Sequence, residues 1–464
     1  MSKSNRPESK SLFVCQQCGK ESLKWLGRCP NCQEWNTLVE KTVVVSTSTF
    51  SRTAPMSPPE ELSQVSIEEN DRLVLPLNEL NRVLGGGLVA GSLVLVGGDP
   101  GIGKSTLLLQ VSALVANARG RVAYVTGEET LHQVKLRAHR LGINGGGLFL
   151  LAETNLDTIL GQMEDLAPGM VVIDSIQAVY LPQLDSSSGS INQVRECAGT
   201  MMRWAKTHGI PVFLVGHVTK EGAIAGPRVL EHMVDVVLYL EGEPFSPYRV
   251  LRGVKNRFGS TNEIGVFEMK GQGLVEVDNP SQAFLSQRGD ETIGSVVVPT
   301  FEGTRPLLIE VQALTNPTSF GLPRRTGNGV DFNRLLLITA VLSRRAGLKL
   351  GNQDVLVNVT GGLKIDEPAA DLGIALAIAS SLRDAGVDRQ TAVVGEIGLS
   401  GEIRAVQQLE RRINEAARLG FKRCLVPKAN MSIDVPSGVE LIPVGTLREA
   451  IKVGLGVGTG HPEE

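Results

Sequence analysis

The stretch GGDPGIGKST carries the clearest chemical signal in this 464-residue sequence. It fits the pattern GxxxxGK[ST], and it lies between an apolar run typical of a strand and a pattern typical of a helix. Glycines let backbone N–H groups approach phosphates, and the helix N-terminus adds partial positive charge. The stretch therefore predicts a site for ATP or ADP with Mg²⁺. Its predicted nucleotide contacts are Gly98, Asp99, Pro100, Gly101, Ile102, Gly103, Lys104, Ser105 and Thr106.

Two further strand ends carry carboxylates that suit this chemistry. MVVIDS puts Asp174 at the end of an apolar run, where a carboxylate holds the Mg²⁺ shell together with the hydroxyl of Ser105. YVTGEE ends another run with Glu128 and Glu129, and a carboxylate there can orient and activate the attacking water. We predict catalysis by Lys104, Asp174 and Glu128, with Glu129 as the alternative base. Acidic residues that only stabilise a helix N-terminus are the simpler interpretation of the Glu pair.

A histidine and two cations complete the set of candidates near the phosphates. FLVGHVTK puts His217 at another strand end, where it is predicted to sense the γ-phosphate; a structural histidine is the alternative. VKNRFGS places Lys255 and Arg257 around one Asn and before a Gly. Taken alone, this stretch also fits a solvated turn between two strands.

Four of the six cysteines lie within residues 15 to 32, as two CxxC pairs. Such pairs form tight knuckles, and four thiolates match the tetrahedral preference of zinc. A redox dithiol pair is the alternative, but it usually needs a thioredoxin-like βαβ context that the segment lacks. The predicted zinc ligands are Cys15, Cys18, Cys29 and Cys32, whereas Cys197 and Cys424 are expected to be small apolar residues.

Composition limits the class of protein. The net charge of -3 excludes a generally basic nucleic-acid coat protein, although it leaves room for local basic grooves. No apolar run reaches membrane-spanning length, and the N-terminal residues lack the apolar core of a signal peptide. We therefore expect a soluble, cytoplasmic protein with no membrane partner.

The chain divides into four predicted segments. A zinc module with four cysteine ligands (1–40) and a flexible linker rich in Ser, Thr and Pro (41–66) come first. Residues 67–282 alternate strand-like and helical runs, which indicates an α/β domain with a mostly parallel central sheet. Residues 283–464 read as an α+β domain with its own core.

The segment LGGGLVAGSLVLVGGDPGIGKST, with TGEE and VVIDS, resembles the core of RecA-type P-loop ATPases. The zinc knuckles, KNRFG and a tail similar to the Lon proteolytic domain narrow the resemblance to the bacterial RadA (Sms) family of DNA repair proteins. The resemblance implies a homohexameric ring ATPase that is stimulated by single-stranded DNA and drives branch migration in recombinational repair. It implies ATP or ADP, Mg²⁺ and Zn²⁺ as cofactors, and single-stranded DNA, branched DNA and a RecA-type recombinase as partners.

The resemblance also implies roles for particular residues. Loops after Asp174 (YLPQLDSSSGSINQ) and after His217 (TKEGAIAGPRVLEH) would line the ring centre, where Lys220 and Arg228 would contact DNA phosphates. Two mobile surface loops are the alternative. Lys255 and Arg257 would reach the γ-phosphate held by a neighbouring subunit. A competing interpretation places Lys255 on DNA.

The Lon-like tail lacks the chemistry of a protease. In DEPAAD, Ala369 occupies the position of the Lon serine nucleophile, and Arg412 aligns with the lysine base. We therefore expect the domain to serve ring assembly first and duplex DNA binding second. The basic residues that could bind DNA, or be ordinary solvated charges, are Arg324, Arg325, Arg344, Arg345, Lys349, Arg411, Arg412, Lys422, Arg423 and Lys428.

The sequence leaves three candidate functions. The first is an ATP-driven DNA motor for recombinational repair. The second is a nucleotide-switched, DNA-binding assembly factor that moves no strand. The third, an ATP-dependent protease, is disfavoured by Ala369 and Arg412.

Overall fold

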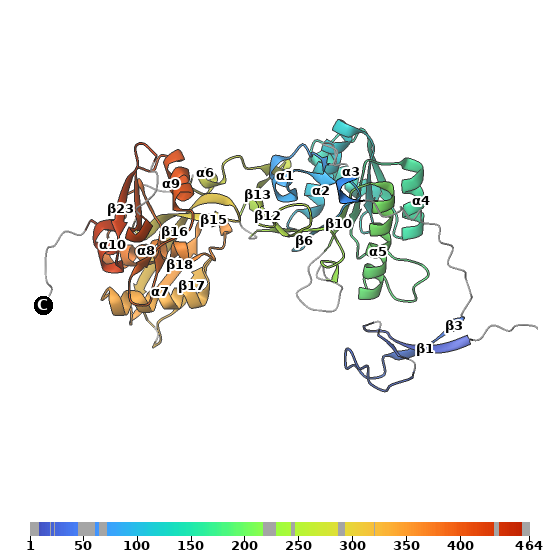
Figure 1. The fold of residues 1–464 in the computed structure, drawn as a ribbon, viewed down its shortest axis with the longest axis horizontal. Coiled ribbons are helices and arrows are strands. Elements are labelled where there is room, and N and C mark those ends of the chain that lie inside the picture. The colour runs from blue at the N-terminus through green and yellow to red at the C-terminus, as the bar shows by residue number, and fades with distance from the viewer. Residues whose placement is uncertain are drawn as a thin grey trace, which may run out of the picture. The chain divides into compact units, whose positions relative to one another are not determined.

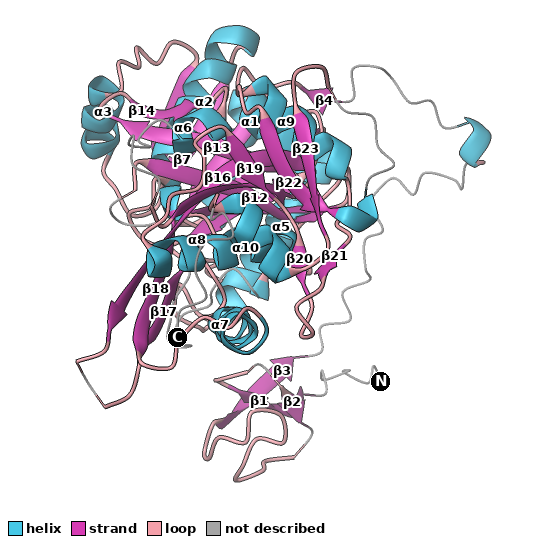
Figure 2. Ribbon diagram, turned by 90° about the vertical axis from the view of Figure 1, so that its left-hand side faces the viewer, coloured by secondary structure: helices cyan, strands magenta, loops and turns pink. Residues whose placement is uncertain are grey.

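The computed structural model places the elements shown in Figures 1 and 2. It describes residues 9–18, 20–22, 24–44, 61–64, 72–216, 229–242, 246–285, 293–319, 321–430 and 436–456. The chain forms two compact units. The first comprises Met1–Pro76, Gly86–Tyr239 and Val254–Gly259, and the second comprises Leu77–Gly85, Leu240–Gly253 and Ser260–Glu464. Among the described helices, none combines the length and the hydropathy that a bilayer crossing requires.

The N-terminal part of the first unit is a small antiparallel sheet of order β2-β1-β3. Its strands are β1 (Ser9–Cys15), β2 (Glu21–Ser22) and β3 (Leu38–Val44). Cys15 ends β1 opposite Leu38, and these two residues with Cys29 form its only cluster of buried residues among those described. A core this small leaves most of the folding free energy of the module to a bound metal.

The rest of the first unit is a three-layer α/β domain. Its strands follow the order β11-β6-β10-β9-β7-β8, and the pairs from β6 to β8 are parallel. A two-strand ribbon, β4 (Arg72–Leu73) with β5 (Leu88–Val89), precedes the sheet. The sheet strands are β6 (Leu93–Gly98), β7 (Val122–Thr126), β8 (Leu148–Ala152), β9 (Met170–Asp174), β10 (Val212–Val215) and β11 (Val236–Glu241).

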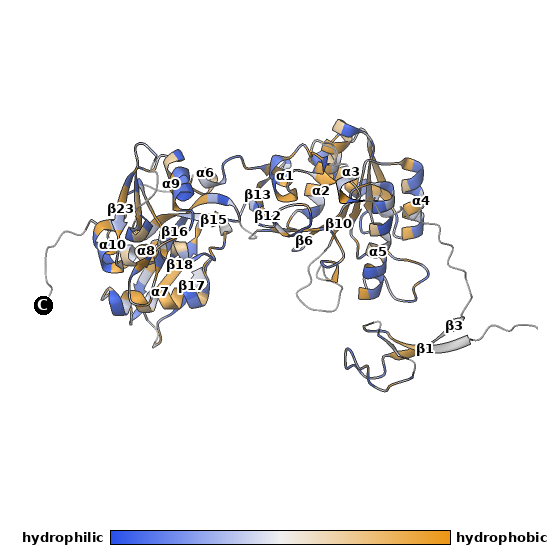
Figure 3. Cartoon of the chain, in the orientation of Figure 1, coloured by the Kyte–Doolittle hydropathy of each residue, from blue (hydrophilic) through white to orange (hydrophobic). Residues whose placement is uncertain are grey.

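Helices cover both faces of this sheet. α4 (Leu156–Leu166) and α5 (Ile191–His208) share one core with alternate residues of the strands, such as Leu95 and Val125. α2 (Lys104–Arg119) packs on the other face, and α3 (Leu131–Arg140) contacts β8. Figure 3 shows both hydrophilic and hydrophobic residues along α4 and α5, as expected of amphipathic helices that cover a sheet. The predicted α/β class with a mostly parallel central sheet is confirmed.

The second unit contains an antiparallel ribbon and a larger mixed sheet. The ribbon is formed by β12 (Tyr248–Asn256), β13 (Ile264–Lys270) and β14 (Gly273–Glu276), with α1 (Asn78–Leu84) against β13. The mixed sheet has the order β17-β18-β16-β15-β19-β22-β23. Its strands are β15 (Ser295–Glu302), β16 (Arg305–Pro317), β17 (Arg325–Asn328), β18 (Gln353–Val359), β19 (Thr391–Val393), β22 (Arg423–Pro427) and β23 (Glu440–Val444).

Helices also cover both faces of the mixed sheet. α7 (Phe332–Arg345), α8 (Asp371–Arg383) and α10 (Leu447–Gly454) belong to one core, and α9 (Leu409–Arg418) belongs to the other. The remaining elements are α6 (Pro280–Leu285) and the hairpin of β20 (Glu396–Ile397) and β21 (Ile403–Arg404), visible in Figure 2. The predicted α+β class is confirmed, whereas the predicted domain boundaries at 40, 66 and 282 stay predictions.

Ala369 and Arg412, which the resemblance places at the positions of the Lon dyad, are both buried. Ala369 lies in the apolar core beneath α9. Arg412 is 3% exposed; its guanidinium donates to both carboxylate oxygens of Glu367, at 2.7 and 2.6 Å, and to the carbonyl of Pro299 at 2.8 Å. The same guanidinium lies 4.6 Å from the ring centroid of Phe301. Arg412 is therefore a structural residue, and its burial removes it from the basic residues considered for DNA binding.

Glu367→Gln is expected to lower the free energy of unfolding of the second unit by about 3 kcal/mol, because it leaves the Arg412 charge buried without a partner. Arg411→Ala, at the neighbouring exposed position of α9, should cost less than about 1 kcal/mol. Urea unfolding monitored by hydrogen exchange of β15 and α9 measures both variants. Equal decreases in the free energy of unfolding for Glu367→Gln and Arg411→Ala would show that the Glu367–Arg412 pair does not stabilise the second unit.

Candidate functional site

The predicted phosphate loop has the geometry that its sequence indicates. β6 ends at Gly98 and α2 begins at Lys104. Gly101 (φ 78°) and Gly103 (φ 117°) adopt left-handed conformations, which only glycine enters without strain. A Cβ on Gly101 would meet no atom within 4 Å, so this position borders open space.

Lys104 is buried beneath this loop, with 3% of its surface exposed. Its ammonium donates to the carbonyls of Gly98 at 2.8 Å and Asp99 at 3.0 Å. Burial lowers the pKa of Lys104, and the charges of Asp174, Asp99 and Glu128 oppose that shift. The cation therefore lies in the electrostatic field of the two carboxylates that were predicted to handle Mg²⁺ and water.

Asp174 and Glu128 come together because β7 and β9 are adjacent parallel strands. Thr126, the last residue of β7, is opposite Asp174, the last residue of β9. The hydroxyl of Tyr124 donates to Asp174 Oδ2 at 2.5 Å, and the hydroxyl of Ser175 donates to Glu128 Oε1. One edge of the sheet thus presents both predicted catalytic carboxylates beside the phosphate loop.

The two glutamates of TGEE have different surroundings. Glu129 forms an ion pair with Arg137 of α3, and its backbone N–H donates to the Thr126 hydroxyl at 3.0 Å. Glu128 instead faces Ser175, the residue after Asp174. This arrangement favours Glu128 over Glu129 as the base, and that role stays a prediction.

Gly127 sets the direction in which Glu128 leaves β7. A Cβ at Gly127 would lie 2.5 Å from the Cβ of Ala178, well inside van der Waals contact. The backbone N–H of Gly127 also donates to the Asp174 carbonyl at 2.9 Å. The methyl group of Ala178 therefore leaves room only for glycine at this position.

The stretch VKNRFGS forms the end of β12 and the bend that follows it, in agreement with the alternative interpretation as a turn between two strands. The Lys255 ammonium donates to the carbonyls of Glu231 (2.8 Å), His232 (3.3 Å) and Val234 (2.8 Å). The three hydrogens of an ammonium match three carbonyls. Lys255 therefore ties the end of β12 to the segment before β11.

Arg257 is held by a different partner. Its side chain is 51% exposed, and its guanidinium donates to Asp235 Oδ1 at 3.2 Å. Asp235 is 2% exposed; its other oxygen accepts the backbone N–H of Leu93, the first residue of β6, at 3.1 Å. A buried carboxylate thus fixes Arg257 to the strand that leads into the phosphate loop.

Three predicted residues lie outside the described residues: His217, Lys220 and Arg228. Their predicted roles, in γ-phosphate sensing and in DNA contact, stay predictions. The loop after Asp174 is described, and Gln193 organises it: its side-chain amide donates to the carbonyls of Leu181, Leu184 and Ser186.

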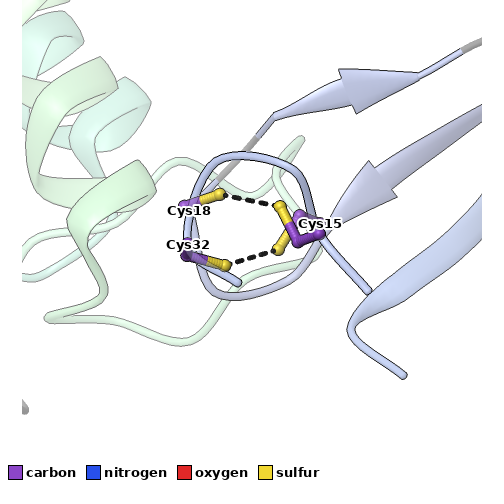
Figure 4. A group of neighbouring side chains, drawn as sticks. Cys15, Cys18 and Cys32 are labelled. Atoms are coloured by element: carbon purple, nitrogen blue, oxygen red, sulfur yellow. Dashed lines mark hydrogen bonds between the residues drawn. The ribbon is translucent and has the colours of Figure 1, made fainter. Parts of the chain in front are cut away.

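The four clustered cysteines form a metal centre. Their sulfurs all lie within 4.8 Å of one another, and Cys15–Cys32 and Cys18–Cys29 approach to 3.6 and 3.5 Å (Figure 4). A tetrahedron with Zn–S bonds of about 2.3 Å has sulfur–sulfur edges of about 3.8 Å, so the donor set fits Zn²⁺. Burial of Cys15 opposes ionisation, but hydrogen bonds with Thr37 and the backbone lower its pKa to about 6.

The other two cysteines have the character that the sequence predicts. Burial raises the pKa of Cys197 and of Cys424 to about 12, with a nearby Glu196 charge adding to the effect at Cys197. Both are therefore neutral, apolar core residues.

Comparison with known proteins decides the family. The DNA repair protein RadA of Halalkalibacterium halodurans is 54% identical over 454 residues, covering 97% of this chain and 99% of its own. RadA of Bacillus subtilis is 52% identical with the same coverage, and RadA of Listeria monocytogenes is 53% identical over 96% of this chain and 98% of its own. The chain belongs to the RadA family of DNA repair proteins.

Family models match three parts of the chain. An AAA domain matches residues 57–223, a rubredoxin metal binding domain matches 13–40, and subunit ChlI of Mg-chelatase matches 321–430. The predicted cofactors ATP with Mg²⁺ and Zn²⁺ are confirmed, as is the Lon-like C-terminal domain. A solved KaiC-like protein from Pyrococcus horikoshii OT3 aligns with 44% of this chain and 98% of its own, at 19% identity and a TM-score of 0.38.

The sequence motifs of this chain did not predict the residues that hold the nucleotide-site side chains in place. Tyr124, Ser175, Arg137 and Asp235 contact predicted site residues, but none of the four was itself predicted to act there. Ser175 had a usable signal, because it directly follows the strand-ending Asp174. The others are brought in by strand and helix packing.

Gly127→Ala is expected to lower kcat for ATP about 10- to 100-fold while ADP affinity stays near that of the wild type, because the new methyl displaces Glu128. The double variant Gly127→Ala/Ala178→Gly removes the clashing methyl and should recover much of the loss. Steady-state ATPase and ADP titrations test both. No recovery in the double variant would refute the packing argument.

Cys32→Ser is expected to remove the bound zinc, whereas Cys424→Ser should keep it. Zinc content by atomic absorption checks this difference. Thiol titration of the wild type should find four cysteines protected until a chelator is added, and Cys197 and Cys424 protected until the chain is denatured. Zinc retained in Cys32→Ser would contradict the four-cysteine centre.

Proposed function

We propose that this member of the RadA family is a ring motor that is stimulated by single-stranded DNA and promotes branch migration of recombination intermediates. The proposal rests on the geometry of Arg257. Its side chain is 51% exposed, and its guanidinium is held by the buried carboxylate of Asp235. A solvated surface arginine needs no such anchor. An arginine that must reach a phosphate on another subunit does, because transition-state stabilisation depends on fixed geometry.

The proposed chemistry assigns one task to each side chain at the sheet edge. Lys104 neutralises the β- and γ-phosphates, and Ser105 with Asp174 holds the Mg²⁺ shell. Glu128, oriented by Ser175, takes the proton of the attacking water. Arg257 of a neighbouring subunit stabilises the charge that develops as the γ-phosphoryl group leaves.

Lys255 was predicted to contact either the nucleotide of a neighbouring subunit or DNA, but its contacts in the structure suggest a structural task. Its three carbonyl partners support a structural task, in which it holds the segment from Glu231 to Val234. A trans contact with nucleotide, or a contact with DNA phosphate, would require it to leave those carbonyls. A guanidinium has five N–H donors, and the contact with Asp235 uses only one nitrogen of Arg257, so we assign the main trans charge to Arg257.

DNA is proposed to contact the loops that follow Asp174 and His217. The loop of residues 180–193 contains no Lys or Arg, so contact there would use hydroxyls and backbone amides. Lys220 and Arg228 would then supply the phosphate contacts, with a RecA-type recombinase delivering the branched substrate. The C-terminal domain is proposed to hold the homohexamer together, with duplex DNA binding as its second role.

A nucleotide-switched assembly factor is the second candidate function. It would use the same phosphate loop, but it would need neither rapid turnover nor strand movement. Two measurements separate the candidates: the ATPase rate with and without single-stranded DNA, and ATP-dependent branch migration on a three-strand recombination intermediate. The motor predicts stimulation and movement. An ATPase rate indifferent to DNA, with no migration, would favour the switch.

Arg257→Ala is expected to lower kcat about 10³-fold with little change in ADP affinity, as loss of an arginine finger does. Lys255→Ala should be milder if Lys255 only holds the segment before β11. Steady-state kinetics and single-stranded DNA binding on the same preparations separate the roles. Intact turnover with weakened DNA binding in Lys255→Ala would assign that residue to DNA, and wild-type turnover in Arg257→Ala would refute the trans charge.

A further inference from the structure

Tyr124 holds the Asp174 carboxylate by a buried side-chain hydrogen bond. The tyrosine is wholly buried at 0% exposure, and Asp174 is 6% exposed. Its hydroxyl donates to Asp174 Oδ2 at 2.5 Å across 50 positions of sequence. A buried phenol normally finds a partner for its hydroxyl, and the partner here is the carboxylate that we propose holds the Mg²⁺ shell.

The strand register explains this reach. β7 and β9 run parallel, with Tyr124 opposite Val172 and Thr126 opposite Asp174. Residues two apart in a strand share a face, so Tyr124 and Asp174 lie on the same face, offset by roughly 6.6 Å along the strands. A phenol ring spans that offset. Its hydroxyl therefore points along the sheet toward the edge where the phosphate loop begins.

In this pair the Tyr124 hydroxyl is the donor and Asp174 Oδ2 is the acceptor. With Oδ2 occupied in this way, the carboxylate cannot rotate without breaking a buried hydrogen bond, so Oδ1 keeps one orientation.

We propose that Tyr124 is a positioning residue for the Mg²⁺ of the nucleotide site, acting by holding Asp174 so that its second oxygen faces the metal shell. This role rests on the proposed Mg²⁺ task of Asp174, but it is independent of the ring and of DNA, because it concerns one phosphate loop and its own carboxylate. Residues that orient metal-site ligands typically contribute 10- to 100-fold to metal affinity, and an effect of about tenfold is expected here.

Tyr124→Phe removes the hydroxyl and keeps the buried ring. Binding of a fluorescent N-methylanthraniloyl-ADP, followed as Mg²⁺ is titrated, reports the metal requirement without any turnover. The variant is expected to need about tenfold more Mg²⁺ for half-maximal binding, while affinity for the nucleotide without Mg²⁺ changes less than about twofold. Saturating Mg²⁺ should restore most of kcat.

Tyr248→Phe is the matched control, because its hydroxyl donates to the Ala283 carbonyl in the second unit. It should leave the Mg²⁺ midpoint unchanged. A midpoint in Tyr124→Phe equal to that of the wild type would overturn the proposal and leave Tyr124 as an ordinary core residue.

A second measurement does not depend on how Tyr124→Phe folds. 3-Fluorotyrosine placed at position 124 retains the hydroxyl, and its ¹⁹F resonance is expected to move when Mg²⁺ joins the ADP complex. A resonance that stays in place while Mg²⁺ binds would show that the phenol does not sense the metal site, and the proposal would fail.

Discussion

The nucleotide site depends on one constraint: parallel strands of a sheet end at the same edge. β6 ends at the phosphate loop, β7 ends before Glu128 and β9 ends at Asp174. The edge therefore gathers a buried ammonium and two carboxylates whose charges act on one another. The cost of burying such charges is offset by hydrogen bonds from Tyr124 and Ser175 and by backbone carbonyls around Lys104.

Local spacing in the sequence was enough to predict the phosphate loop, the zinc cysteines, the strand-ending Asp174 and the fold class. Each of these depends on residues close in sequence, whose geometry a few glycines or a CxxC pair already determines. The supporting contacts depend instead on register. Tyr124 reaches Asp174 across 50 positions and Arg257 reaches Asp235 across 22, and no local pattern specifies which residues of neighbouring strands will be opposite each other. The sequence also suggested Arg412 as a surface cation, but Glu367 holds it in the core.

In the C-terminal domain, both positions that the Lon resemblance assigns to a catalytic dyad hold structural side chains. An alanine in the serine position can be packed into an apolar core, and an arginine in the lysine position can bind a carboxylate with two parallel hydrogen bonds. Both side chains therefore contribute to the stability of the domain. This arrangement agrees with a domain that we propose to support assembly, and it separates the ATPase chemistry of the first unit from any proteolytic chemistry in the second.

The central claim is that Arg257 completes a nucleotide site on a neighbouring subunit. Mixing Lys104→Ala protein with Arg257→Ala protein tests it most directly, because each variant alone lacks one half of every site. If the site is shared, an equal mixture should regain up to about a quarter of wild-type turnover, the statistical share of neighbouring pairs that carry both intact side chains. No regained turnover, in mixtures shown by differential labelling to form joint assemblies, would contradict the claim.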